Sequence, residues 1–189
     1  MSPILGIYAS QQSGHLSNFY SIATQTVGAG GASSITFSSI PSTYTHLQIR
    51  ALSQNAQSTT GYDQISMRFN GDTGTNYTDH YIIGNGSTAS ANAETSVTSI
   101  RRIGVSGESG SANVFGANII DILDYANTNK YKTARGLYGR DGNTNNTDGI
   151  VVLASGLWLN TAAITSITLF DITGFNFTQN SSFALYGVR

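Results

Sequence analysis

Hydrophobic and polar residues alternate along much of this chain with the period of two that is typical of half-buried β-strands. The alternation is clearest over residues 45–52, where Leu47, Ile49 and Ala51 share one face and the polar His46, Gln48 and Arg50 share the other. Residues 63–69 repeat the pattern, with the apolar Ile65, Met67 and Phe69 against Gln64, Ser66 and Arg68. These two segments predict strands that bury one face.

Strand-like runs and turn clusters follow one another from residue 18 onward. The runs span residues 19–27, 33–39, 45–52, 63–69, 77–83, 97–105, 114–125, 131–138, 150–159, 164–172 and 183–188. About ten short strands separated by clusters of Gly, Asn, Asp and Ser predict an antiparallel β-sandwich or barrel. We expect very little helix, with at most a single helical turn near residues 160–163.

Residues 1–17 lack a clear period and predict an N-terminal arm that precedes one sandwich domain over residues 18–189. The arm carries the apolar side chains Ile4, Leu5, Ile7 and Tyr8. Large apolar groups are costly to leave in water, so we expect the arm to bind a surface. An alternative that stays open is an edge strand of its own domain.

The composition excludes several classes of protein. Charged residues make up 10% of the chain and the net charge is −1, so we expect no nucleic-acid partner and no anionic membrane partner. The chain has no Cys, which excludes disulfides and thiolate chemistry. No apolar run approaches the length of a membrane span. The short apolar stretch 3–9 lacks a basic flank, so we also expect no signal peptide.

No group of residues forms a catalytic motif, and we predict that the protein is not an enzyme. The three histidines are His15, His46 and His80, and we interpret them as surface residues. Asp79 and His80 are neighbours on a predicted strand and therefore point to opposite faces. Asp121 and Asp124 lie three apart on a predicted strand, which would also place them on opposite sides.

The segment Asp141–Asp148 is the best candidate for a cation site. Its oxygen ligands Asp141, Asn143 and Asn145 match the start of a calcium loop. Asn146 stands where that loop needs Gly, and Val152 stands where it needs a bidentate Glu. A polar hairpin tip explains these residues as well, so we predict no metal and no cofactor, and a cation here stays an open alternative.

Two Gly-rich stretches, 28–31 and 104–110, superficially resemble phosphate-binding loops. Neither continues into a Gly-Lys-Ser/Thr motif or a helical pattern. We interpret both as turns.

Several stretches taken together resemble the small β-sandwich virion proteins of tailed bacteriophages. They are ILGIYASQQSGHL at 4–16, AGGASSITFSSIPSTYTHLQIR at 29–50, MRFNGDTGTNYTDH at 67–80, DILDYANTNKYKT at 121–133 and FALYGV at 183–188. The resemblance spans most of the chain, although its motifs are mainly strand and turn sequences. It implies an all-β sandwich of jelly-roll type.

The resemblance also implies a non-enzymatic structural role on the outer surface of a phage particle. One role in that group is a capsid decoration (cement) protein, generally a homotrimer, that binds the major capsid protein or other virion proteins. The arm residues Ile4, Leu5, Ile7 and Tyr8 would then anchor it in the shell. The alternative role is a tail fibre or spike component that contacts host-surface glycans. The short chain and its apolar arm favour the first.

Overall fold

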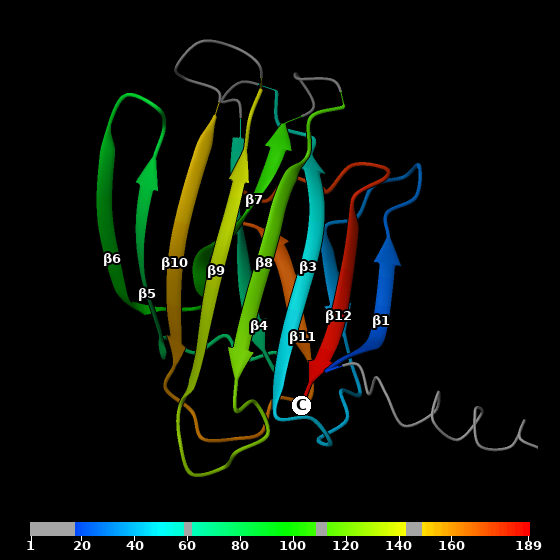
Figure 1. Cartoon of the computed structure of the whole chain (residues 1–189), viewed down its shortest axis with the longest axis vertical. Coiled ribbons are helices and arrows are strands. Elements are labelled where there is room, and N and C mark those ends of the chain that lie inside the picture. The colour runs from blue at the N-terminus through cyan, green and yellow to red at the C-terminus, as the bar shows by residue number, and fades with distance from the viewer. Residues whose placement is uncertain (1–17, 59–61, 109–112, 143–148) are drawn as a thin grey trace, which may run out of the picture.

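The computed structural model describes residues 18–58, 62–108, 113–142 and 149–189, which form twelve β-strands in two layers (Figure 1). The arm residues Ile4, Leu5, Ile7 and Tyr8 lie outside the described residues. No helix in the described part of the chain is long and apolar enough to cross a membrane.

The larger sheet has eight strands and lies in front in Figure 1. In spatial order its strands are β6 (Ala89–Val97), β5 (Tyr77–Gly84), β10 (Ile150–Trp158), β9 (Lys132–Arg140), β8 (Gly116–Leu123), β3 (His46–Asn55), β12 (Ser182–Val188) and β1 (Phe19–Thr26). The smaller sheet consists of β2 (Ser34–Phe37), β11 (Ile167–Asp171), β4 (Tyr62–Phe69) and β7 (Ile100–Glu108). Every strand pair is antiparallel in the described residues except a short parallel contact between the ends of β3 and β7, which joins the sheets.

Eight of the strands have the topology of a jelly roll. Four antiparallel pairs are nested along the chain: β1 with β12, β2 with β11, β3 with β8, and β4 with β7. Such nested pairs behave as one long hairpin that rolls up into two sheets, here β1-β12-β3-β8 and β2-β11-β4-β7. The predicted all-β jelly-roll sandwich is therefore confirmed.

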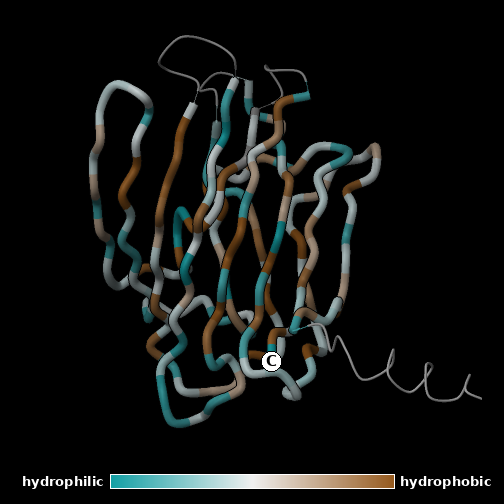
Figure 2. Tube along the Cα trace, in the orientation of Figure 1, coloured by the Kyte–Doolittle hydropathy of each residue, from teal (hydrophilic) through white to brown (hydrophobic). Residues whose placement is uncertain are grey.

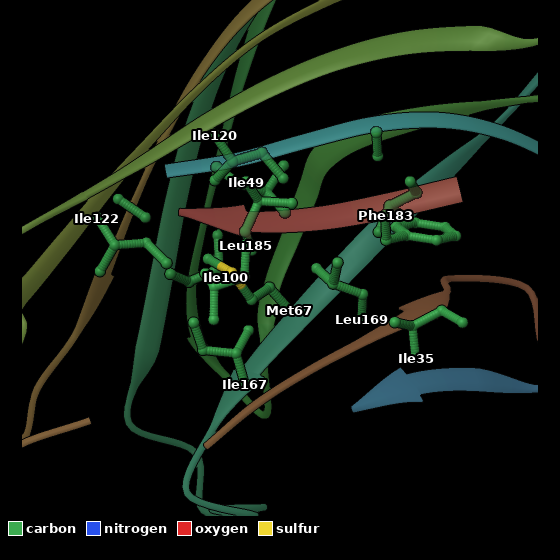
Figure 3. Close-up of a cluster of buried hydrophobic side chains, with 14 of the residues drawn as sticks. Ile35, Ile49, Met67, Ile100, Ile120, Ile122, Ile167, Leu169, Phe183 and Leu185 are labelled. Atoms are coloured by element: carbon green, nitrogen blue, oxygen red, sulfur yellow. The ribbon is translucent and has the colours of Figure 1, made fainter. Parts of the chain in front are cut away.

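The core fills the space between the two sheets. The alternation predicted for β3 and β4 is confirmed, since Leu47, Ile49 and Met67 are fully buried. Labelled side chains from both sheets, including Ile100 and Leu185, point toward one another in Figure 3. The apolar faces predicted from the period of two thus meet in one contiguous core.

Two inserted hairpins widen the larger sheet. The β5–β6 hairpin interrupts the nested pairs between β4 and β7, and the β9–β10 hairpin interrupts them between β8 and β11. They meet where β10 pairs with β5, so that β9, β10, β5 and β6 form a four-stranded extension beside β8 (Figure 1). The extension reaches beyond the jelly roll, and this is the part of the fold that positions the candidate site.

Strand β7 packs against the inner face of β8, β9 and β10 at very short range. A Cβ atom on Gly116 or Gly136 would overlap a carbonyl oxygen of β7, and a Cβ atom on Gly156 would overlap the Ile100 side chain. Only glycine permits so close an approach. Asn118 reinforces the contact, because its side chain accepts a hydrogen bond from the Val105 amide at 2.6 Å and donates one to the Val105 carbonyl at 3.0 Å.

Two details of the sequence prediction were wrong. Gly107 lies within β7 and not in a turn, and a Cβ atom there would overlap the Val114 carbonyl oxygen. Strand β6 was missed, since it is exposed along nearly its whole length and therefore lacks apolar alternation. Gly104 lies within β7, as the strand-like run 97–105 predicted. Residues 160–163 form no helical turn, which is within the expectation of at most one; the Asn160 side chain accepts a hydrogen bond from the Ala162 amide at 2.9 Å.

The close packing of β7 leads to a stability prediction. Replacing Gly136 with Ala forces the Ile103 backbone away from β9, so we expect the free energy of unfolding to fall by about 1–3 kcal/mol in urea titrations. The matched control is Gly84→Ala on β5, where nothing lies within 4 Å of the new Cβ, and we expect a change within about 0.5 kcal/mol. Equal effects of the two substitutions would contradict the packing described.

Candidate functional site

The candidate site is a band of exposed aliphatic side chains on the outer face of the larger sheet, which we call the apolar stripe. It consists of Leu52, Ile82, Ile119, Leu137, Val151 and Leu153. These six side chains are between 44% and 65% exposed. Together they present on the order of 600 Å² of apolar surface, which is as large as the largest patch on typical monomers.

Strand register makes the apolar stripe continuous. Ile82 on β5 lies opposite Leu153 on β10, Leu153 lies opposite Leu137 on β9, and Leu137 lies opposite Ile119 on β8. Directly opposed side chains in a sheet are near enough to touch. Four aliphatic residues from four strands therefore form an unbroken row across the sheet.

A second row lies beside the first. Val151 is two residues from Leu153 on β10, and Leu52 on β3 lies opposite Ala117 on β8. Between them, Gly139 on β9 pairs with both Val151 and Ala117. Two shallow grooves of about 640 and 550 Å³ run along the apolar stripe, one over β3, β8 and β9 and the other over β5 and β10.

The local sequence of β9 and β10 explains why large side chains face outward here. The central inward positions are small, namely Ala134, Gly136, Ala154 and Gly156, because β7 occupies the space beneath them. The outward positions of the same strands hold Leu137, Val151 and Leu153. An antiparallel sheet normally turns a polar face to water, whereas strands that are apolar on both faces are typical of sheets covered on both sides. Figure 2 shows these hydrophobic stretches along β8, β9 and β10.

The polar border of the apolar stripe contains one ion pair and one arginine that lies over an aromatic ring. Asp121 on β8 accepts hydrogen bonds from Arg135 on β9 and from Gln48 on β3, each at 2.8 Å. Although partial burial opposes the change, these donors lower the pKa of Asp121 and keep it ionised. On β3, the Arg50 guanidinium lies 5.2 Å from the centre of the Tyr186 ring. Arg50 lies opposite Ile119 in the register of β3 and β8, so its guanidinium stands at the edge of the stripe, whereas the six stripe residues themselves are uncharged.

Asp121 and Asp124 do not lie on opposite faces of one strand, as the sequence predicted. Asp124 follows the end of β8 with a positive φ of 48°, so the strand rule that separated it from Asp121 does not apply. Both carboxylates lie near His46, whose Nδ1 accepts a hydrogen bond from the Asp124 amide at 3.0 Å. A hydrogen bond from Lys130 lowers the pKa of Asp124, so neither carboxyl is tuned to carry a proton at neutral pH.

The β5–β6 hairpin is tied to β7 by charged groups beneath the extension. Glu94 on β6 forms ion pairs with both Arg101 and Arg102 on β7. The Tyr138 hydroxyl donates to the Arg102 carbonyl at 2.7 Å. Asp79 on β5 is buried and accepts a hydrogen bond from the Arg101 amide at 3.0 Å, and burial raises the pKa of its carboxyl. These contacts hold the extension against the jelly roll.

The other residues singled out in the sequence do not form a site in the described structure. His80 is exposed and Asp79 is buried, which confirms that they point to opposite faces. Only Asp141 and Gly142 of the segment Asp141–Asp148 are described, and the remainder lies outside the described residues, as does His15. Within the residues that the structure describes, no three His, Asp or Glu side chains gather as metal ligands would.

Comparisons with known proteins add little to this geometry. No family model matches the chain, and no curated protein matches its sequence. Among solved structures, the VP2 subviral particle of infectious bursal disease virus is a weak neighbour, at 13% identity and a TM-score of 0.13. The match covers 90% of this chain and 41% of the VP2 chain, so this chain spans less than half the length of that neighbour. Likeness at that level carries no argument about function.

Sequence reasoning missed the apolar stripe, although part of its pattern was visible. The β10 segment IVVLASGLW reads as an apolar run with little alternation, and such a run is consistent with a strand covered on both faces. The pairing of β10 with β5 was not visible, and it is this pairing that places Ile82 beside Leu153.

The buried Asp79 leads to a prediction about pH. Because burial raises its folded-state pKa, stability from the protonated form is present at low pH and is lost as the pH rises through that pKa. Asp79→Asn keeps an acceptor for the Arg101 amide and carries no charge, so we expect it to raise the free energy of unfolding at pH 7. The gain should shrink toward pH 4 in urea titrations. A variant less stable than the wild type at pH 7 would contradict this assignment.

Proposed function

We propose that this chain is a non-enzymatic structural protein of a bacteriophage virion, a capsid decoration (cement) protein that stabilises the outer shell of the head. The observation that carries the proposal is the apolar stripe, an exposed aliphatic surface that crosses four strands of the jelly-roll sandwich. Such a surface favours protein partners, because binding there depends on shape and on burial of apolar area.

Stabilisation of the shell follows from mass action. A protein that binds assembled capsid subunits and not their dissociated form shifts the equilibrium toward the assembled shell. No bond is made or broken in this process. The partners in the proposal are the major capsid protein and other copies of this chain, in a homotrimer whose symmetry matches the site that it occupies.

The arm and the folded domain have different roles in this proposal. Ile4, Leu5, Ile7 and Tyr8 supply the anchor that binds grooves of the shell. The jelly roll supplies a stable head outside the shell. The low charge of the chain, with 10% charged residues, fits attachment through apolar contact.

A second candidate function is a tail fibre or spike component that contacts host-surface glycans. Tyr131 is 52% exposed and Phe175 is 39% exposed, and exposed aromatic rings favour binding surfaces of that kind. The apolar stripe, however, contains no aromatic ring. The larger continuous surface therefore favours a protein partner.

The role of the arm is tested by truncation. We expect a chain lacking residues 1–12 to keep the wild-type unfolding midpoint and to lose attachment to phage particles in a co-sedimentation assay. The control is Ile4→Leu, which preserves apolar character at the anchor and should bind as the wild type does. If the truncated chain binds particles as well as the wild type does, the arm is not the anchor and the proposal is contradicted.

Copy number separates the two candidate functions. Quantitative mass spectrometry of purified particles should give copies on the order of hundreds for a capsid decoration, because the shell repeats its sites by symmetry. A number in the tens or fewer, together with selective binding on a glycan array, would favour the tail component.

A further inference from the structure

We propose that the apolar stripe is a homotypic interface, in which the stripe of one copy of this chain packs against the stripe of another. The proposal deepens the proposed function and rests on it for its biological setting, whereas the self-association itself is a property of the isolated chain. The occupant of the surface is a second copy, and three observations favour it.

The first observation is area. The apolar stripe presents on the order of 600 Å² of apolar surface, and a stable protein interface buries about 800 Å² on each partner. The polar border formed by Arg135, Asp121 and Gln48 lies directly beside the stripe and supplies the remaining area. An apolar centre with a hydrogen-bonded rim is the usual anatomy of such an interface.

The second observation is charge. Two identical surfaces meet at little cost when their centres are uncharged, because like charges at the centre would face each other. The six stripe residues are uncharged, and Asp121 beside them is paired with Arg135 at 2.8 Å. Arg50 lies opposite Ile119 at the edge of the stripe, where its guanidinium lies over the Phe19 and Tyr186 rings. The whole chain has a net charge of −1, so repulsion between copies is small.

The third observation is shape. Ile82, Leu153, Leu137 and Ile119 form a straight row across four paired strands, with shallow grooves along it. Sheet faces pack about 10 Å apart when side chains of one face fit between those of the other. A contact between the same row on two copies is isologous and needs a two-fold axis, so in the proposed shell it joins copies from different homotrimers.

Charge placed in the centre of the apolar stripe tests the proposal. We expect the wild-type chain to sediment at a mass above the 20.0 kDa of one chain, and Leu137→Glu and Leu153→Glu to weaken self-association at least about 100-fold. Both side chains are half exposed, so the variants should keep the wild-type circular dichroism spectrum and unfold cooperatively. The matched control is Thr36→Glu, at an exposed strand position of the smaller sheet, which should leave the sedimented mass unchanged.

Cross-linking gives a second readout that does not depend on disrupting the interface. Because the chain has no Cys, a single Leu153→Cys substitution provides one reactive thiol on each copy. A bis-maleimide linker of about 10 Å should join copies through position 153 and should fail to join them in Thr36→Cys.

Three results would overturn the proposal. The first is a wild-type chain that stays monomeric at tens of micromolar, and the second is an oligomer that survives both Glu substitutions with its mass unchanged. The third is a loss of particle attachment in Leu137→Glu without any loss of self-association, which would assign the stripe to the capsid. A dye-binding experiment identifies the occupant if the wild-type chain is monomeric. Binding of an apolar dye only after residues 1–17 are removed would mean that the arm covers the stripe. If the isolated chain does not self-associate, the homotypic interface is excluded, whereas attachment to the capsid is still tested separately by truncation of the arm.

Discussion

The close approach of the β7 backbone to β8, β9 and β10 is the contact on which the rest of the structure depends. Glycine at positions 116, 136 and 156 lets β7 lie where side chains would otherwise stand. That contact joins the two sheets and holds the four-stranded extension to the jelly roll. It also leaves little room for large inward side chains at the middle of β9 and β10, where Gly136 and Ala154 face β7 while Leu137 and Leu153 face outward.

The outer face of the larger sheet consequently carries the aliphatic residues that are typical of a sheet face packed against another layer. Leu137, Leu153 and Ile82 would be ordinary core residues if another layer lay over them. The ion pair between Asp121 and Arg135 removes charge at the edge of this face without involving a partner. We therefore expect shape and apolar area to contribute more than electrostatic attraction to binding at this face, in keeping with the low charge of the whole chain.

The sequence predicted the strands that bury one face in the core and expose the other face to solvent. Leu47 and Ile49 alternate with polar residues because β3 has one face in the core, and the strand was placed closely. Strand β6 was not found, because a strand exposed on both faces carries no apolar period. Gly107 was assigned to a turn, since a close approach of its backbone to Val114 leaves no local pattern in the sequence. The apolar stripe depends on the pairing of β10 with β5, which links the two inserted hairpins and is equally invisible to local reasoning.

We propose a component of a phage particle in which the outer sheet face of one copy is covered by another copy. Electron cryo-microscopy of intact phage particles tests this claim most directly. The account predicts jelly-roll density on the outer surface of the head, with Leu137 and Leu153 buried between neighbouring copies. Density confined to the tail, or copies on the head whose apolar stripes face solvent, would contradict it.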